Sequence, residues 1–451
     1  MIVPRTRLLL WVSFIVLPFA AVGATIPAAA SVAILVIGGL AALAVNDAFA
    51  GRRRLGGIRV HLPESTRFLK DRPGHLEVRI ENLSLEARSI RVGFAFPVEI
   101  NPDSDDRIAQ LPPGAAYSQL EWPVTPTKRG LYFLDRAYIE SVSPLGFWGV
   151  RANHAVRSEL KVYPNLMRER KHVAALFLKR GQLGAHAQRQ AGQGRDFEKL
   201  RDYVPGDSYD EIHWKASAKR GHPVTKIFQI ERTQEVYVIL DASRLSAREV
   251  TLADPESPTG TARTTTLERY ITGALILALA AERQGDQFGL LTFSDRVLNF
   301  VRAKSGQSHF DACRDRLHTL QPQDVTPDFE ELCAFIRLRL RRRALLIFLT
   351  SLDDPMLAEN FSKATELISR QHLILADMLQ PPGAHPLFQD SAVHQPDDLY
   401  RQLGGHFRWH SLRELEKVLK RRGVRLSLLD PEKLAGQLVA QHADVKRRQL
   451  I

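Results

Sequence analysis

The sequence GRDFEKLRDYVPGDSYDEIHWKASAKRGHPVTKIF, residues 194–228, brings acids, bases, two histidines and several aromatic residues into one segment. Its apolar residues do not recur at positions i, i+3, i+4 and i+7, so it is not a simple amphipathic helix. Two turn signals, Pro205-Gly206 and Gly221, divide it. The pattern predicts a segment that packs between two surfaces and pairs its charges locally. The segment is therefore expected to form a junction between two domains.

The order and spacing of these residues resemble the signature of the DUF58 family. The resemblance rests on Gly194, Phe197, Leu200-Arg201-Asp202-Tyr203, Pro205-Gly206-Asp207, Ile212-His213-Trp214-Lys215 and Ala218-Lys219. It implies a bacterial membrane-associated scaffold or adaptor that works with a MoxR-type AAA+ ATPase in the assembly or maturation of complexes. It also implies a von Willebrand factor A-like domain after this signature segment. The interaction residues on this basis are Arg201, Asp202, Tyr203, Pro205, Gly206, Asp207, His213, Trp214 and Lys215.

The amino-terminal residues 1–56 predict a membrane anchor. No charged residue occurs from Leu8 to Val45, and as one helix this run would be about 57 Å long, roughly twice the thickness of a hydrocarbon core. The sequence GATIP at residues 23–27 supplies a break. We therefore expect a hairpin of two transmembrane helices, near residues 8–22 and 28–45. A cleaved signal peptide is the alternative for the first run, and the second run would then still anchor the chain.

Positive charges flank both apolar runs. Arg5 and Arg7 precede the first run, and Arg52, Arg53 and Arg54 follow the second. Because positive flanks favour the cytoplasmic side, we expect a multi-pass protein of the inner (cytoplasmic) membrane whose soluble domains face the cytoplasm. The chain has two cysteines, in no metal-ligand spacing, and they provide no disulfide framework. This composition favours a reducing compartment.

Residues 57–165 predict a β-sandwich of immunoglobulin-like type. Apolar and polar residues alternate in short runs such as HLEVRIE at 75–81 and GLYFLD at 130–135, and turn signals such as NPD at 101–103 separate them. A spacer between membrane and later domains is favoured over a binding module, because folds of this type carry many functions. Residues 166–230 combine a basic, Gly/Gln-rich linker with the signature segment.

Residues 231–451 change to an alternating order of apolar strands and helices. The expected buried strands are EVYVILD at 235–241, QFGLLTF at 287–293, ALLIFLT at 344–350, HLILAD at 372–377 and VRLSLL at 424–429, with helices near 267–283, 308–320 and 329–341. This order predicts a mostly parallel, Rossmann-like sheet with helices on both faces. The fold class expected for the chain is therefore α/β plus all-β: a transmembrane helical hairpin, a β-sandwich, and a von Willebrand A-type domain.

Asp241, Ser243 and Thr326 are the candidate ligands of a Mg²⁺ ion. Ligands of parallel sheets bind at the carboxyl ends of strands, and Asp241-Ala-Ser243 resembles the start of the von Willebrand A metal site, Asp-x-Ser-x-Ser followed by a Thr and an Asp. Two positions depart from that pattern. Leu245 replaces the second Ser, and Ser351 stands where the late Asp is expected, with Asp353 and Asp354 beyond it. A loop that keeps the fold without a metal is favoured.

Other functional classes find less support in the sequence. No GxxxxGK[ST], HExxH, GxSxG or GxGxxG pattern occurs, so no enzyme class is indicated. The signature acids with His213 leave a cell-envelope hydrolase as an alternative, but a charge network at a domain junction is favoured, with Trp214 as a buried packing anchor. The net charge of +12 leaves nucleic-acid binding as a further alternative, although no binding motif accompanies the basic runs. We expect a non-enzymatic protein with protein partners.

Overall fold

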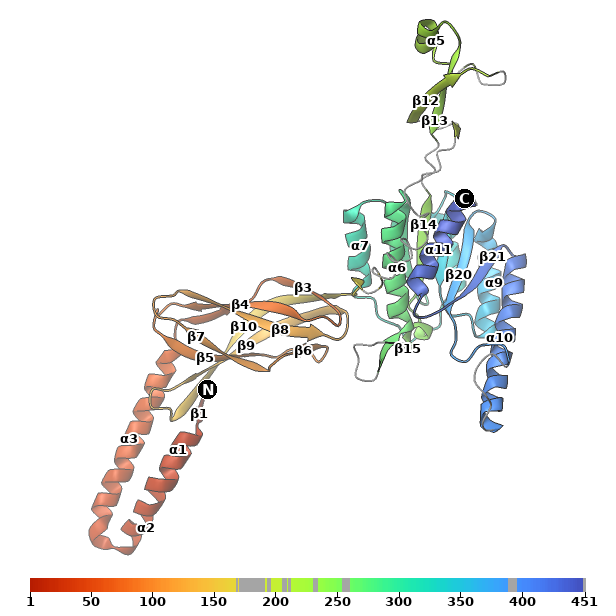
Figure 1. Cartoon of the computed structure of the whole chain (residues 1–451). Helices are drawn as coiled ribbons and strands as arrows, with labels where there is room; N and C mark the ends of the chain where they lie inside the picture. Colours follow the sequence, from red (N-terminus) through yellow and green to blue (C-terminus); the bar gives the residue numbers. More distant parts are fainter. Residues whose placement is uncertain are drawn as a thin grey trace. The chain divides into compact units, whose positions relative to one another are not determined.

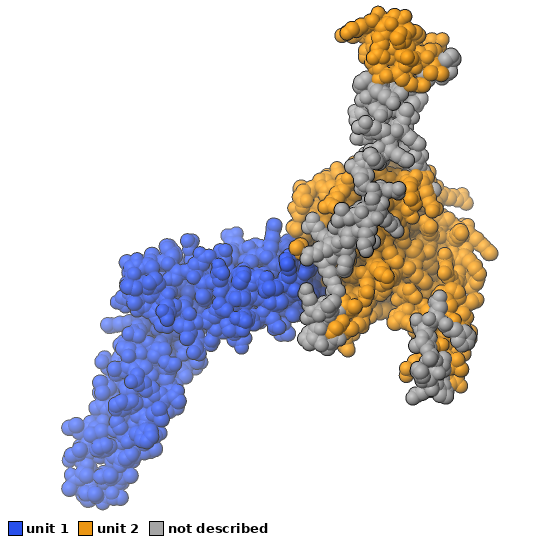
Figure 2. Space-filling view, in the orientation of Figure 1, with its two compact units in different colours: residues 1–165 blue, residues 166–451 orange. Residues whose placement is uncertain are grey.

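The computed structural model describes residues 1–167, 169, 191–192, 196–204, 209, 212–229, 234–253, 260–387 and 396–448. The chain divides into two units, residues 1–165 and 166–451, which Figure 2 colours separately. One hydrophobic core lies between the sheets of the first unit, and two lie on opposite faces of a sheet in the second.

Two apolar helical segments lie side by side at the amino terminus (Figure 1). The first comprises α1 (Thr6–Trp11), a π-helical turn (Val12–Val16) and α2 (Leu17–Thr25), and the second a 3-10 turn (Pro27–Ala29) and α3 (Ala30–Arg54). Ile26 between them has an extended backbone, because the ring of Pro27 disfavours a helical conformation in the preceding residue. Both segments are long and apolar enough to cross a membrane. The predicted break is confirmed, but the second helix continues well beyond Val45.

Two β-sheets enclose the core of residues 1–165. One has the strand order β1-β10-β9-β5-β7, with β3 also pairing β10, and the other has the order β2-β4-β8-β6. The strands are β1 (Ile2–Pro4), β2 (Ile58–His61), β3 (Ser65–Leu69), β4 (Gly74–Asn82), β5 (Arg88–Phe94), β6 (Ile100–Pro102), β7 (Asp106–Leu111), β8 (Tyr117–Pro126), β9 (Gly130–Val142) and β10 (Trp148–Tyr163). Leu76, Val78 and Ile80 of β4 are fully buried, and the residues between them are exposed, as alternation along a strand requires.

The predicted sheet-rich domain is thus confirmed, with two features that alternation did not reveal. Strand β3 pairs with β10 in parallel, whereas the pattern predicted antiparallel strands. Strand β1 comes from the residues before the first apolar helix and pairs with the start of β10. Strand β1 has three residues, too few to show the alternation of apolar and polar residues that predicts a strand.

A six-stranded sheet with helices on both faces forms the α/β region. Its order is β18-β17-β14-β19-β20-β21, and all neighbouring strands are parallel except β18 at one edge. The strands are β14 (Glu235–Asp241), β17 (Gln287–Phe293), β18 (Val297–Lys304), β19 (Leu345–Leu349), β20 (Leu373–Leu379) and β21 (Val424–Leu429). Each of the five apolar runs predicted as a strand therefore forms one.

Alternate residues of β14 face the two helical layers. Val236, Val238 and Leu240 pack with α6, α7 and α11, and Tyr237 and Ile239 pack with α8, α9 and α10. The helices are α6 (Thr266–Arg283), α7 (Gln307–Leu317), α8 (Phe329–Arg339), α9 (Pro355–Ser369), α10 (Pro396–Arg421) and α11 (Leu434–Arg447). A hairpin of β15 (Glu249–Ala253) and β16 (Thr261–Thr265) lies between β14 and α6 in the chain.

The described residues of the signature segment contribute two strands to a small sheet and include helix α5. The sheet has the order β11-β13-β12, from β11 (Ala191–Gly192), β12 (Asp196–Asp202) and β13 (Val224–Gln229). Helix α5 (Trp214–Arg220) lies between β12 and β13 in the chain, and Gly221 ends it in the left-handed conformation that favours glycine.

Candidate functional site

The carboxyl ends of three neighbouring parallel strands align at one edge of the α/β sheet. Leu240 of β14 lies opposite Leu349 of β19, and Leu349 lies opposite Asp377 of β20. This register places Asp241 and Thr350, the residues that follow Leu240 and Leu349, beside one another. We call the loops at this edge of the sheet, residues 242–248, 294–296, 321–328 and 350–354, the carboxyl edge.

Both carboxylate oxygens of Asp241 accept hydrogen bonds within this edge. Its Oδ2 accepts a 2.6 Å hydrogen bond from Thr350 Oγ1, and its Oδ1 accepts a 2.8 Å bond from the backbone N–H of Ser243. The side chain is almost fully buried, and burial raises its pKa, although the bonds from Thr350 and Ser243 oppose that rise. Asp241 therefore fixes the loop after β14 to the end of β19.

Tyr270 of α6 joins the same network. Its hydroxyl donates a 3.2 Å hydrogen bond to the carbonyl oxygen of Thr350 and accepts a 3.3 Å bond from the N–H of Leu379. The ring is fully buried, and burial raises the pKa of the phenol, so it stays protonated. One helix and the ends of two strands are thus bonded through a single buried hydroxyl.

Asp377, which was not among the predicted site residues, is a second buried acid close to this network. Burial raises its pKa to about 7, and the 3.2 Å hydrogen bond from Gln441 Nε2 to its Oδ1 only partly opposes this effect. The run HLILAD offered a signal, because its Asp follows apolar residues as Asp241 does in EVYVILD, although β20 continues to Leu379. Both carboxyls lie in the interior.

The candidate metal ligands have different surroundings. Ser243 is fully buried beside Asp241, whereas Thr326 lies exposed in its loop. Leu245, at the position of the second Ser, is buried in the core. Asp353 pairs with Arg248 at 2.7 Å, and Asp354 caps α9.

These surroundings leave an incomplete donor set for Mg²⁺. The two acids beyond Ser351 have other partners, and both oxygens of Asp241 already accept hydrogen bonds. Within the described ranges no group of three or more His, Cys, Asp or Glu residues is placed to hold a metal ion. The residues present do not fit the full pattern, so the metal site stays a prediction.

Backbone hydrogen bonds tie the edge loops to one another. Gln323 N donates to Ala242 O at 2.7 Å, and Arg244 N donates to Val325 O at 3.1 Å. Asp328 N donates to Ser294 O at 3.0 Å. The loop 321–328 is therefore fixed to the exits of both β14 and β17. The carboxyl edge is a preformed surface.

The signature residues that the structure describes have mainly structural contacts. His213 caps α5, because its Nδ1 accepts a 3.1 Å hydrogen bond from Ala216 N. Asp202 pairs with His222 at 3.0 Å, and Tyr203 N donates to the carbonyl of Pro223. Lys215 and Arg201 are exposed. The predicted residues Pro205, Gly206 and Asp207 lie outside the described residues.

The prediction that Trp214 is a buried packing anchor is wrong. Its side chain is 67% exposed, and Tyr209 is 74% exposed. Trp214 is the first residue of α5, and the only buried residue of this short helix is Ser217, whose Oγ donates to His213 O and accepts from Val224 N. The helix is therefore held by hydrogen bonds, and the indole is left on the surface.

Comparison with known families confirms the family resemblance. Residues 199–394 match the family model described as "Protein of unknown function DUF58". The match begins within the signature segment and extends through most of the strands of the α/β region. No curated protein matches the sequence.

Among solved structures, an aerotolerance-related membrane protein from Bacteroides fragilis is similar at 13% identity and a TM-score of 0.30, covering 48% of this chain and 99% of that one. The PilB minor pilin from Streptococcus sanguinis is similar at 10% identity and a TM-score of 0.32, covering 90% of this chain and 94% of that one. At these TM-scores neither similarity establishes a common fold.

Proposed function

We propose that this chain, with its DUF58 region, is a multi-pass, non-enzymatic scaffold of the inner membrane that docks a protein partner on its carboxyl edge. The apolar helices anchor the chain, the immunoglobulin-like sandwich acts as a spacer, and the α/β region is a von Willebrand A-type domain. The arginines that flank both helices favour a cytoplasmic position for the soluble parts. The family resemblance suggests a MoxR-type AAA+ ATPase as the partner, in the assembly or maturation of complexes.

One observation carries this proposal. Asp241 at the end of β14 and Asp377 within β20 are each about 1% exposed, and both accept hydrogen bonds from buried or half-buried side chains. Buried acids of this kind offer no surface to a substrate. The loops themselves are bonded to one another. A rigid surface of this kind suits protein docking, because little conformational entropy is lost when a partner binds.

The alternatives gain no supporting contact within the part of the chain that the structure describes. A hydrolase would need His213 beside a signature acid, but Asp202 pairs with His222, and one ring nitrogen of His213 caps a helix. A nucleic-acid-binding role would need a binding motif, and the sequence shows none.

Binding of a purified MoxR-type ATPase to the full chain in lipid nanodiscs tests the docking surface. Arg244 is exposed at the carboxyl edge, and Arg342 is exposed before β19, at the opposite edge of the sheet. We expect Arg244→Glu to weaken binding about tenfold, equivalent to about 1.4 kcal/mol, and Arg342→Glu to leave it unchanged. Equal effects from the two matched charge reversals would contradict docking at the carboxyl edge.

Calorimetry with Mg²⁺ decides whether a metal takes part. We expect no binding heat from the full chain in detergent at millimolar Mg²⁺, because Leu245 supplies no ligand and the Asp241 oxygens are occupied. Heat that disappears in the Asp241→Ala variant would instead support a metal-dependent contact with a carboxylate of the partner.

A further inference from the structure

We propose that the β9–β10 turn, residues 143–147, sits in the interfacial layer of the membrane against both apolar helices. The β-sandwich then rests directly on the lipid surface in a fixed orientation. This inference rests on the proposed membrane anchorage and adds to it a second element that contacts lipid. All of its residues belong to the unit 1–165.

One face of α3 is buried against this turn. Leu40, Ala44, Asp47 and Gly51 follow one another at spacings of four, three and four residues, which places them on one side of a helix. All four are buried, whereas most other residues of α3 are exposed. A single buried face on an apolar helix indicates a specific protein contact.

Phe147 fills the space between the two helices at this level. It clusters with Leu8 of the first segment and with Leu40 and Ala44 of α3, and its ring meets Trp11 edge-on with centroids 6.1 Å apart. The N–H of Arg5 donates a 2.9 Å hydrogen bond to Phe147 O. The turn is therefore held from both helices.

Asp47 fixes the turn to α3 through three hydrogen bonds. Its carboxylate accepts from Ser143 Oγ at 2.6 Å, from Leu145 N at 2.8 Å and from Phe147 N at 3.3 Å. A buried carboxylate just after an apolar run is costly unless donors satisfy it, and these donors come from the turn. Gly51 permits the close approach, because a Cβ there would lie 3.0 Å from Ser143 Cβ.

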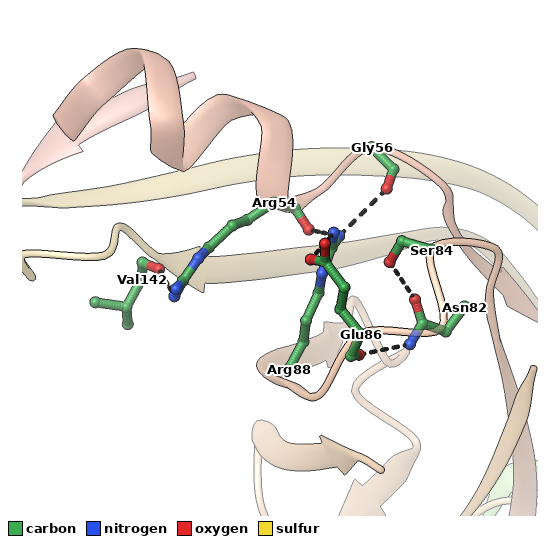
Figure 3. A network of polar contacts seen from close by, with 7 residues as sticks. All are labelled: Arg54, Gly56, Asn82, Ser84, Glu86, Arg88 and Val142. Carbon is green, nitrogen blue, oxygen red and sulfur yellow. Dashed lines mark hydrogen bonds and ion pairs between the residues drawn. The ribbon is translucent and has the colours of Figure 1, made fainter. Parts of the chain in front are cut away.

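A second set of contacts holds the end of α3 (Figure 3). Arg88 of β5 donates to the carbonyl oxygens of Arg54 and Gly56, and Arg54 Nη1 donates to Val142 O at 3.2 Å. A cation at the last carbonyls of a helix also interacts favourably with the helix dipole. Together the two sets prevent the sandwich from pivoting freely on its anchor.

Trp148 indicates how deep the turn lies in the membrane. Its indole Nε1 donates a 2.7 Å hydrogen bond to Ala44 O, and Ala44 lies at the end of the uncharged run that closes at Val45. Tryptophan is enriched where the hydrocarbon core meets the headgroups. Leu145, in the same turn, stays 44% exposed. An exposed leucine at this level of the helices is suited to contact with lipid.

Fluorescence of a polarity-sensitive label on single cysteines tests the proposal, with the full chain in bilayers. Leu145→Cys reports the turn, and Leu35→Cys reports α3 within the apolar run, where Leu35 is 75% exposed. Val98→Cys is the matched control, because Val98 is 93% exposed and lies far from the anchor. It follows Phe94, the last residue of β5, and β5 extends about 20 Å away from Arg88. The native Cys313 and Cys333 are fully buried, and the unsubstituted chain measures their background.

We expect the label at Leu145 to emit at shorter wavelength than the label at Val98 and to be quenched by spin-labelled lipid, as at Leu35. If the label at Leu35 reports lipid but the label at Leu145 reports water, as at Val98, the turn does not contact the membrane. The membrane anchorage of the helices would still be supported. If Leu35 also reports water, the anchorage itself fails, and the seating of the turn fails with it.

Discussion

The hydroxyl of Thr350 donates a 2.6 Å hydrogen bond to the carboxylate of Asp241, which lies 109 positions earlier in the chain. The bond joins the ends of two adjacent parallel strands, and both side chains are about 1% exposed. It shows how the α/β region uses its strand-end acid: the carboxylate stabilises the loops around it.

Thr350→Val should destabilise the α/β region by about 1–3 kcal/mol, the usual cost when a buried polar group loses its partner. Valine keeps the shape of threonine but cannot donate to Asp241. Thermal unfolding of the purified chain in detergent measures the effect. Thr350→Ser is the control, because it retains the hydroxyl and should lose much less stability. Equal stability of Thr350→Val and wild type would show that this bond contributes nothing.

Asp377→Asn should stabilise the protein more at pH 8 than at pH 5. Burial raises the pKa of Asp377 from 3.8 to about 7, so the folded state holds a proton that the unfolded state releases. The contribution of Asp377 to the free energy of unfolding is therefore largest below about pH 4, and it is lost as the pH rises to about 7. The shift corresponds to at most about 4 kcal/mol, and asparagine removes this pH dependence.

Unfolding curves at the two pH values measure the difference for Asp377→Asn. Glu249→Gln, an exposed change in the same region, should show no such dependence. A stability difference from wild type that is the same at pH 5 and pH 8 would show that Asp377 does not titrate in this range.

Arg269→Met should cost about 3–5 kcal/mol, because it leaves a buried carboxylate without its partner. Arg269 of α6 pairs with Glu169 at 2.7 Å, and both side chains are at most 9% exposed. The guanidinium also donates to Pro431 O. Chemical denaturation of Arg269→Met and of the double variant with Glu169→Leu tests the pair. The double variant should recover part of the loss, and failure to recover would assign the cost to packing.

Asp47→Ala should loosen the β9–β10 turn without unfolding the sandwich. The amides of Leu145 and Phe147 lose their acceptor, so their hydrogen exchange should accelerate. Hydrogen bonds to a charged group contribute about 1.5–3 kcal/mol each. Mass-resolved hydrogen exchange measures this, with the β4 segment around Val78 as the internal reference. Unchanged protection of the turn would show that Asp47 does not hold it.

Trp214→Ala should change stability by less than about 0.5 kcal/mol, as is usual for exposed positions. The indole is 67% exposed, and its backbone position at the start of α5 does not depend on the ring. Ser217→Ala provides the contrast, because the Ser217 hydroxyl bridges His213 and Val224 and is buried. A large loss of melting temperature in Trp214→Ala would restore the packing role predicted for it.

The strongly periodic parts of this chain could be predicted from local sequence. The five parallel strands, the sheet-rich domain and the break between the apolar helices depend on apolar runs, alternation and a proline. Each of these signals lies within a few consecutive residues. The physical cause is local, because burial on one or both faces of an element sets its hydrophobic period.

Tertiary structure decided which partner each polar side chain meets. Asp241 matches a metal-site motif, yet its oxygens accept from Thr350 and Ser243. Asp47 appears in the sequence as the first acid after an apolar run, yet it anchors a turn about 100 residues away. Hydrogen bonds at such separations depend on strand register and helix packing. A single sequence determines the period of burial, but only the folded chain determines which donors surround a buried carboxylate.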